Sequence, residues 1–298
     1  MRHPWPTETL EYRMADALTL RLMTRAEADW LVERAADEGW NPGLHDAEIF
    51  WATDPEGFIA AELDGELIGG GSIVSYDGSF GFMGLFILRP EFRGRGLGRQ
   101  LWHARVRLLQ SRLGLGSAIG MDGVYAMQDW YAEGGFVFSH RDIRFEGVGA
   151  EAEPVDGVVP ASDVPFVQLA AYDRRCFPAL REGFLRAWLD QPDSRALAVA
   201  DGGHLRGFGL IRGCRIGAKI GPLYADDASI AEALYTSLAS FAPGEPVYLD
   251  VPEVNAWAMS LAQRHEMREV FGCARMYLGS QPRVADGHIY GVTTFELG

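Results

Sequence analysis

Lysine is almost absent from the sequence: Lys219 is the only one in 298 residues. A phosphate-binding loop of the GxxxxGK[ST] type requires a lysine, and the residues around Lys219 do not have that spacing. A Schiff-base or pyridoxal enzyme would have to depend on Lys219 alone. The scarcity of lysine therefore argues against both classes of protein.

Cysteine is also scarce, and the histidines form no pattern. Cys176, Cys214 and Cys273 lie far apart, are odd in number and form no CxxC pair. This excludes a disulfide scaffold and a cysteine zinc site, and it fits a reducing compartment. The seven histidines show no HExxH or other metal-binding spacing, so we expect no metal.

The chain also has no long apolar run and no basic-then-apolar leader. These absences predict a cytoplasmic protein without a membrane span. A formal net charge of −14 argues against nucleic acid or an anionic membrane as a partner. The chain is instead rich in apolar residues, and at 48% hydrophobic it can bury a full core, while its length predicts two domains.

The first half of the chain alternates strands and helices. Asp64-Gly65 and Asp77-Gly78 separate three alternating runs, which predicts three neighbouring antiparallel strands joined by hairpins. In order, we expect a strand (18–23), a helix capped by Thr24, a short helix ending near 50, strands 58–63, 67–76 and 80–88, a long helix (97–114), a strand (118–121), a helix (126–133) and a strand pair (136–145).

The second half repeats this pattern. "ELDGELIGGGSIV" (62–74) and "VADGGHLRGFGLI" (199–211) share an Asp-Gly turn followed by Gly-x-Gly, about 137 residues apart. A glycine turn opening a helix (221–241), a strand (247–251), a helix (255–265) and a closing strand (270–278) follow. We therefore predict an α/β (α+β) fold in two copies, residues 1–150 and 151–298, joined by the polar stretch 151–159.

The most informative stretch is "FILRPEFRGRGLGRQL", which starts at Phe86 and holds four arginines and three glycines. A strand ends at Leu88 and a helix begins near Leu97, so Gly94, Gly96 and Gly98 occupy the turn and the start of the helix. Unpaired N–H groups at a helix start attract anions, and glycines leave those groups accessible. Arginine forks suit phosphate oxygens.

The turn therefore looks built to hold a pyrophosphate; the plainer alternative is a glycine-rich connection with solvated arginines. A dinucleotide-binding fold does not explain it. The spacing is GxGxG instead of GxGxxG, the preceding strands are linked by hairpins, and strand 118–121 carries no acidic residue.

The sequence resembles the GCN5-related N-acetyltransferases, the GNAT superfamily. Arg93-x-x-Gly96-x-Gly98 after a strand matches the signature [Q/R]-x-x-G-x-[G/A], and "DWYAEGGF" (129–136) matches the later tyrosine segment. "EGWNPGLHDAEIF" (38–50) and "MDGVYAMQDWY" (121–131) resemble a bacterial tandem subgroup with a typical first domain and a degenerate second one. The resemblance implies two tandem domains, each a mixed, mostly antiparallel twisted sheet flanked by helices.

The resemblance also implies a cofactor, acetyl-CoA, and its site. The pantetheine arm would pair with the fourth strand at Phe86, Ile87 and Leu88, with the Phe86 N–H facing the thioester carbonyl. The pyrophosphate would lie on the turn formed by Arg93, Gly94, Arg95, Gly96, Leu97, Gly98 and Arg99. Tyr131 would protonate the departing thiolate, unless it is a helix tyrosine that only packs inward.

Two positions depart from the family pattern. Gly84 stands where many members carry a glutamate base, and Asp122-Gly123-Val124 replaces an asparagine that contacts CoA. The base is therefore open: Asp46, Glu48, Asp122 or a water-relayed group could serve, or the amine arrives already neutral. Asp122 is equally well explained as part of an Asp-Gly turn.

The loop between the first two helices overhangs the thioester end in this family. That would place Trp40, Asn41, Asp46 and Glu48 near the acceptor, where an aromatic ring and carboxylates favour a cation. Trp40 is also explained as an anchor for the loop. The partner expected from this charge is a small-molecule amine.

The second copy lacks the chemistry of the first. Asp226 and Asp227 stand where the first copy has its arginine turn; they suit helix capping and would repel a phosphate. Asn255 resembles the asparagine that the first copy lacks, but Ala262 aligns with Tyr131. This copy is expected to shape or close the acceptor pocket.

Two functions are compatible with these features. The first is transfer of an acetyl group from acetyl-CoA to an amine by direct attack. The alternative is a catalytically silent protein that binds or senses acyl-CoA, which the missing strand glutamate permits. The protein is expected to be a monomer or a homodimer.

Overall fold

The two halves of the chain run through the same order of elements. The protein is described here by a computed structural model over residues 18–298. The first half holds β1 (Leu18–Leu22), α1 (Arg25–Asp37), α2 (Asp46–Thr53), β2 (Phe58–Leu63), β3 (Glu66–Tyr76), β4 (Phe80–Leu88), α3 (Leu97–Ser111), β5 (Ala118–Val124), α4 (Gln128–Glu133) and β6 (Val137–Val148). The second half holds β7 (Val158–Pro160), α5 (Phe166–Cys176), α6 (Glu182–Leu189), β8 (Ser194–Asp201), β9 (His204–Gly213), β10 (Ala218–Ala225), α7 (Ala228–Ala239), β11 (Pro246–Pro252), α8 (Ala256–Arg264) and β12 (Arg268–Leu278). The predicted repeat is confirmed, and a short strand, β13 (Ile289–Gly291), follows it without a counterpart.

Local sequence signals account for most boundaries. Thr24 and Glu27 form the predicted capping box at the start of α1. Asp64-Gly65 and Asp77-Gly78 adopt positive φ angles in the two hairpin turns, as Asp-Gly turns require. Two expectations were wrong. Residues 136–145 do not form a strand pair, because β6 is one continuous strand, and Gly221 lies inside β10, so that α7 begins only at Ala228.

All thirteen strands of the described residues belong to one mixed, mostly antiparallel sheet. The strand order is β1-β2-β3-β4-β5-β12-β6-β11-β10-β9-β8-β7, with β13 paired to β10. Within this part of the chain only β4–β5 and β10–β11 are parallel. When each strand is matched with its counterpart in the other half, the order reads the same from both ends.

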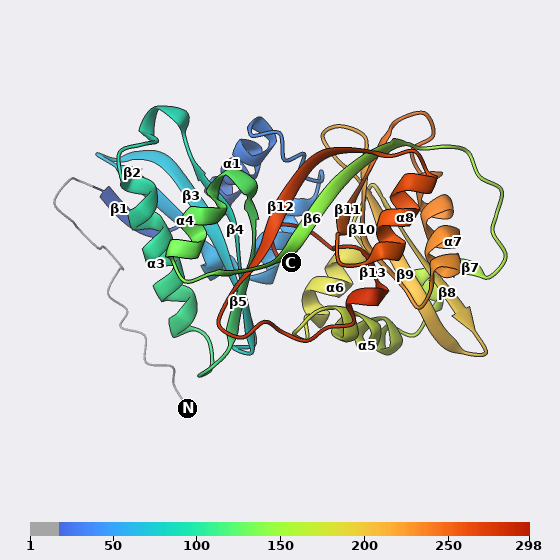
Figure 1. The fold of residues 1–298 in the computed structure, drawn as a ribbon. Coiled ribbons are helices and arrows are strands. Elements are labelled where there is room, and N and C mark those ends of the chain that lie inside the picture. Colours follow the sequence, from blue (N-terminus) through green and yellow to red (C-terminus); the bar gives the residue numbers. More distant parts are fainter. Residues whose placement is uncertain (1–17) are drawn as a thin grey trace.

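The two halves exchange their last strands at the centre of the sheet. β12 lies between β5 and β6, and β6 lies between β12 and β11. The two long strands cross the middle of the molecule side by side, β6 in green and β12 in red (Figure 1). The predicted boundary at 150/151 falls between β6 and β7, but β6 and β12 each lie among strands of the other half.

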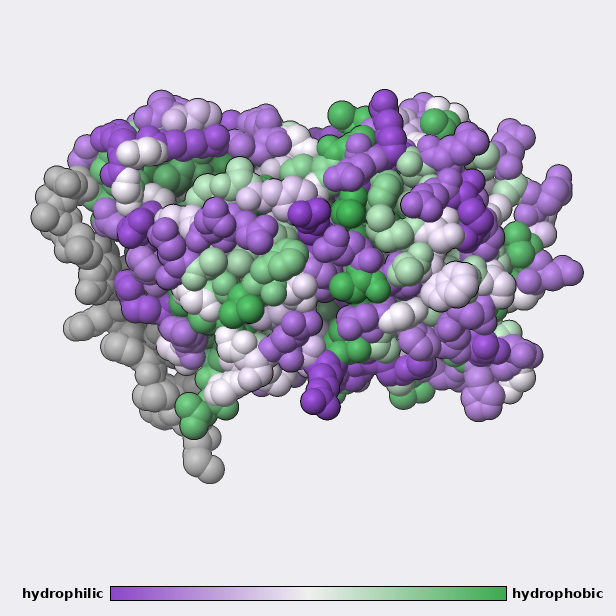
Figure 2. Space-filling model, viewed as in Figure 1, coloured by the Kyte–Doolittle hydropathy of each residue, from purple (hydrophilic) through white to green (hydrophobic). Residues whose placement is uncertain are grey.

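The hydrophobic core is also shared between the halves. The Phe50 ring of α2 stacks on Trp188 of α6 with ring centroids 6.0 Å apart, and both side chains are buried. The face drawn in Figure 2 is mostly hydrophilic, and its apolar areas are small and separate. None of the helices within residues 18–298 combines the length and the hydropathy of a membrane-spanning segment.

Candidate active site

The site starts where β4 separates from its parallel neighbour β5. Pairing between the two strands ends at Met83↔Met121. Leu85 then adopts φ +46, a backbone conformation that costs energy for a residue with a side chain, and the register against β3 shifts at the same place. Beyond this irregularity β4 still pairs with β3, but the edge that faces β5 is left open.

The glycine turn lies at the end of the opened strand. Gly96 is the N-cap of α3 and has φ +77, while Gly94 has φ +73. Both conformations favour glycine. A Cβ atom built on either residue would have no heavy atom within 4 Å, so the main chain is bare on that side. The first N–H groups of α3 have no partner within the helix.

The three arginines of the turn have different surroundings. Arg93 donates from Nε to the Leu88 carbonyl oxygen at 2.8 Å and is paired with Glu38, so it braces the end of β4. The Arg95 guanidinium lies over the Phe92 ring at 5.6 Å. Arg99 lines the cavity described below.

Tyr131 is held on α4 by an aromatic cluster. Its ring stacks on Trp102 of α3 at 5.0 Å, and Trp130 stacks on Phe86 of β4 at 6.1 Å. Gly123 on β5 makes room for the tyrosine, because a Cβ atom there would lie 2.3 Å from the ring of Tyr131. Burial raises the pKa of Tyr131 to about 12, so its hydroxyl stays protonated at neutral pH.

A cavity of about 550 Å³ joins these parts. Of the residues predicted for the site, the structure brings these to its wall: Trp40, Phe86, Ile87, Leu88, Arg93, Gly94, Gly96, Gly98, Arg99, Asp122 and Tyr131. Five others are not part of its wall: Asn41, Asp46, Glu48, Arg95 and Leu97. The cavity therefore runs from the glycine turn, along the open edge of β4, to Tyr131.

Asp122 reaches the cavity but is already paired. Arg275 of β12 donates to both of its carboxylate oxygens, at 2.6 and 2.7 Å, and lies 3.4 Å from Asp142. Burial raises the pKa of Asp122 and the Asp142 carboxylate adds to this, while Arg275 opposes both. Asp122 is therefore not an Asp-Gly turn residue but a residue of β5 that forms a buried charge cluster with Arg275 of β12 and Asp142 of β6.

The acceptor residues predicted from the first loop are mostly used elsewhere. Asp46 is buried, and Arg212 of β9 donates to both of its oxygens at 2.9 and 3.2 Å. Asn41 exchanges two hydrogen bonds with the main chain of Ile216, and Glu48 is exposed on α2. Trp40 alone of the four lines the cavity.

The structure adds residues that the sequence analysis missed. Arg105 on α3 is fully buried, and its Nη2 donates to the carbonyl oxygen of Gly84 at 2.6 Å and to that of Ser72. Its Nε and Nη1 have no hydrogen-bond partner among the described residues, and burial lowers its pKa to about 9. Four more cavity residues come from the end of the chain, where no motif marks them: Phe271, Cys273, Phe295 and Glu296.

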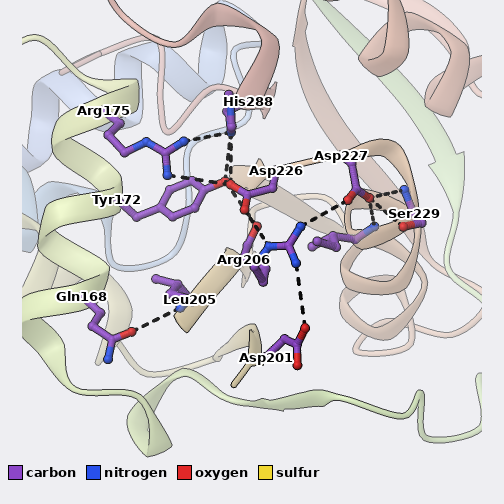
Figure 3. A network of polar contacts seen from close by, with 11 residues as sticks. Gln168, Tyr172, Arg175, Asp201, Leu205, Arg206, Asp226, Asp227, Ser229 and His288 are labelled. Carbon is purple, nitrogen blue, oxygen red and sulfur yellow. Dashed lines mark hydrogen bonds and ion pairs between the residues drawn. The ribbon is translucent and has the colours of Figure 1, made fainter. Parts of the chain in front are cut away.

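The second half has no arginine turn at the equivalent place, and Figure 3 shows what replaces it. Asp227 caps α7 by accepting from the N–H groups of Ser229 and Ile230, as predicted. Asp226 instead accepts from Tyr172 at 2.8 Å and from Arg206 at 2.7 Å, and it lies 3.3 Å from His288. At this corner the Asp226 carboxylate thus pairs with the positive charge of Arg206.

A mixed sheet with a splayed fourth strand, a bare helix start and a tyrosine in one cavity is the arrangement that the resemblance to the GNAT superfamily predicts. The sequence comparisons agree with it. The acetyltransferase (GNAT) family matches residues 22–139, and an acetyltransferase (GNAT) domain matches residues 169–291. The chain belongs to the GNAT superfamily and contains two GNAT domains in tandem.

Similar proteins cover nearly the whole chain. Holothin acyltransferase from Pseudoalteromonas sp. (strain SANK 73390) is 26% identical over 274 residues, 91% of this chain and 92% of that protein. The crystal structure of a putative acetyltransferase from Pyrococcus horikoshii has a TM-score of 0.83 at 24% identity, covering 98% of this chain and 100% of that one. A tandem GNAT protein from the clavulanic acid biosynthesis pathway has a TM-score of 0.62 at 12% identity, covering 89% and 99%.

Proposed function

We propose that this protein transfers an acetyl group from acetyl-CoA to an amine of a small molecule. The observation that carries the proposal is the continuity of one cavity from Gly96 at the start of α3, along β4, to Tyr131. The two ends of the cavity supply different chemistry. The end at Gly96 offers main-chain N–H groups and Arg99 to phosphates, and the end at Tyr131 offers a hydroxyl group that can donate a proton.

The residues of the turn fit coenzyme A. The bare main chain at Gly94 and Gly96 leaves room for a diphosphate beside the N–H groups of α3. The open edge of β4 offers the main-chain groups of Phe86 and the N–H of Leu88 to an extended amide chain, as a neighbouring strand would use them. When bound, acetyl-CoA supplies a thioester as the acyl donor.

The residues around that thioester have distinct roles. The Phe86 N–H lies on the open edge of β4 and can donate to a carbonyl oxygen as negative charge develops on it. Tyr131 gives its proton to the departing sulfur. Because a thiol has a pKa near 8.5, its thiolate is already a fair leaving group, and the tyrosine assists rather than enables the step.

The acceptor is proposed to be an amine because a carboxylate that no arginine pairs with among the described residues, Glu296, lines the cavity together with the aromatic rings of Trp40 and Phe271. Such surroundings favour a cation over an anion. The similarity to an enzyme named for acylating holothin supports a small molecule as acceptor.

The cofactor site is tested by thermal unfolding with acetyl-CoA. A ligand at 100 times its Kd stabilises the folded protein by about 2.7 kcal/mol, so a clear rise in Tm is expected. Gly96→Asp places a negative charge in the turn and is expected to abolish the rise. Gly116→Asp is the matched control, since Gly116 has a similar φ of +82 and equally open surroundings in a loop away from the cavity.

Turnover separates the enzyme from a silent acyl-CoA-binding protein. Release of the coenzyme thiol is followed with polyamines, amino acids, aminoglycosides and peptide N-termini as acceptors. Amine-dependent release supports the transferase. A Tm rise that Gly96→Asp abolishes, with no thiol release for any amine class, favours the silent protein instead.

A further inference from the structure

The last residues of the chain fill an opening in the second half. β10 and β11 stop pairing at Ile220↔Leu249, just as β4 and β5 separate in the first half. β13 pairs with β10 beyond that point, and the Val292 N–H donates to the Asp250 carbonyl oxygen on β11 at 2.9 Å. The opening that forms a cavity in the first half is thus occupied by the chain itself in the second.

Side chains of both halves hold this C-terminal segment (residues 289–298) in place. Asn255 donates from Nδ2 to the Ile289 carbonyl oxygen at 2.9 Å. Arg181 donates to Thr293 Oγ1 at 2.8 Å and to the Gly298 carbonyl oxygen at 2.6 Å. Tyr76 of the first half donates to the Leu297 carbonyl oxygen at 2.8 Å. The segment is therefore a fixed part of the structure.

The segment brings Glu296 against Gly84 of β4. A Cβ atom on Gly84 would lie 2.1 Å from the Glu296 carbonyl oxygen and 2.9 Å from its Cα. The main chain of residue 296 therefore occupies the space that a side chain at position 84 would need. Glu296 is only 5% exposed, and it lines the cavity together with Phe86 and Tyr131.

Within residues 18–298, no arginine forms a hydrogen bond or an ion pair with the Glu296 carboxylate. Arg275 holds Asp122 and Arg212 holds Asp46, each through two hydrogen bonds. Among the described residues, the hydrogen bond donated to the Glu296 carboxylate comes from the Thr294 hydroxyl group.

The charged groups around Glu296 come from several elements. Arg144 on β6 and Arg212 on β9 are close enough for Glu296 to add to the rise of their pKa values, but each is neutralised, by Asp250 and Asp46. The remaining titratable groups that share the cavity wall are Glu38, Arg93, Arg99, Arg105, Asp122, Tyr131 and Cys273.

We propose that Glu296 is the base that deprotonates the acceptor amine. The inference rests on the proposed transferase function. Glu296 accepts one proton from R–NH₃⁺, and the freed electron pair forms the C–N bond to the acyl carbon while the C–S bond breaks. Tyr131 gives its proton to sulfur and regains one from the acylated nitrogen. Glu296 releases its proton to water, so one proton is produced in each turnover.

The test compares Glu296→Gln and Glu296→Asp with the wild type, and Glu245→Gln, at an exposed site in the second half, serves as control. Thiol release is measured from pH 6 to pH 10 with the best primary amine of the acceptor screen. Binding of acetyl-CoA is measured by calorimetry, and Tm is recorded for each variant. We expect kcat of Glu296→Gln to fall about 10²- to 10⁴-fold at pH 7, with unchanged acetyl-CoA affinity and Tm.

The defect is expected to shrink as the pH approaches the pKa of the amine, because the acceptor then arrives neutral. Glu296→Asp, which retains a carboxylate, is expected to recover part of the rate. Turnover of Glu296→Gln within threefold of wild type would overturn the proposal, and so would a loss that is equal at every pH or comes with weaker acetyl-CoA binding. If the wild type itself releases no thiol with any amine, the proposed function fails, and this inference fails with it.

Discussion

At the scale of single residues, the partners of a carboxylate decide what it can do. Asp46 and Asp122 are both buried aspartates near the ends of helices or strands, yet each is held by an arginine through two hydrogen bonds. Among residues 18–298, Glu296 has no arginine bonded to its carboxylate, and it is one of the residues that line the cavity. Judged by residue type alone, these three carboxylates are equally good candidates for a catalytic base.

Tyr131 gives the first prediction. Tyr131→Phe removes the proposed proton donor and is expected to lower kcat by about 10²-fold, at the low end for acid–base catalysis because the leaving thiolate is already stable. Burial holds the pKa of Tyr131 at about 12, so the tyrosine stays protonated below about pH 11. The variant is therefore expected to lose the same factor from pH 7 to pH 10.

Tyr125→Phe is the matched control for this measurement. Burial raises the pKa of Tyr125 to about 12 as well, but its ring lies outside the cavity wall. Steady-state kinetics with saturating acetyl-CoA compare the two variants. Equal rates for Tyr131→Phe and Tyr125→Phe would show that the Tyr131 hydroxyl group takes no part.

At the scale of elements, β5 determines where α4 places its tyrosine. Gly123 lies on β5 with the Tyr131 ring directly above it, so a methyl group at this position would collide with the ring at 2.3 Å. The aromatic cluster of Trp102, Trp130 and Phe86 leaves the ring little room to move aside.

The second prediction follows from this contact. Gly123→Ala is expected to displace the Tyr131 ring, to cost about 1–3 kcal/mol of folding free energy through overpacking, and to lower kcat while acetyl-CoA still binds. Chemical unfolding and calorimetry measure the two effects. Gly183→Ala on α6, where nothing lies within 4 Å of the added methyl group, is expected to leave both unchanged or to stabilise slightly. Wild-type kcat in Gly123→Ala would contradict the placement of the tyrosine.

The elements also show which parts of the fold could be predicted from local sequence patterns. The hairpins at Asp64-Gly65 and Asp77-Gly78 and the glycine turn at Gly96 were predicted because turn geometry is written in adjacent residues. Which strands pair with each other is not determined by adjacent residues. Nothing in the sequence pattern of β6 or β12 shows that each strand pairs with strands of the other half. Gly84 did carry a signal, since a glycine inside a buried strand often marks a close approach of main chain. The sequence could not show that the approaching chain is residue 296.

At the scale of the whole molecule, buried ion pairs join the two halves. Asp46 pairs with Arg212, Arg144 with Asp250, and Asp122 with Arg275, and in each pair one residue comes from each half. Charges buried in this way are costly unless they are paired, so the pairs penalise any arrangement that separates the halves.

The third prediction concerns the stability of this junction. Asp46→Asn leaves Arg212 buried without its counter-ion and is expected to cost about 3–5 kcal/mol at pH 7. Burial alone would raise the pKa of Asp46, but Arg212 outweighs it and holds the pKa below its ordinary value. A lowered folded-state pKa means that the stabilisation is complete above the unfolded pKa of about 3.9 and is lost as the pH falls through the folded value.

Urea unfolding of the wild type and of Asp46→Asn, at pH 7 and at successively lower pH, measures this loss of stability and its dependence on pH. The difference between wild type and Asp46→Asn is expected to be constant above about pH 4 and to narrow below it. Asp37→Asn removes an exposed partner of Arg34 and is expected to change stability by less than about 1 kcal/mol. A difference at pH 7 no larger than that of Asp37→Asn would show that the Asp46–Arg212 pair does not hold the halves together.

The palindromic order of the strands has a consequence for the origin of the chain. Two separate copies of one ancestral unit would build the same sheet as a homodimer, each lending its final strand to its twin. Once a linker joined the copies, their sequences would be free to diverge. One copy could then keep the glycine turn and its cavity while residues 289–298 fill the matching opening in the other, which would leave one site in place of two.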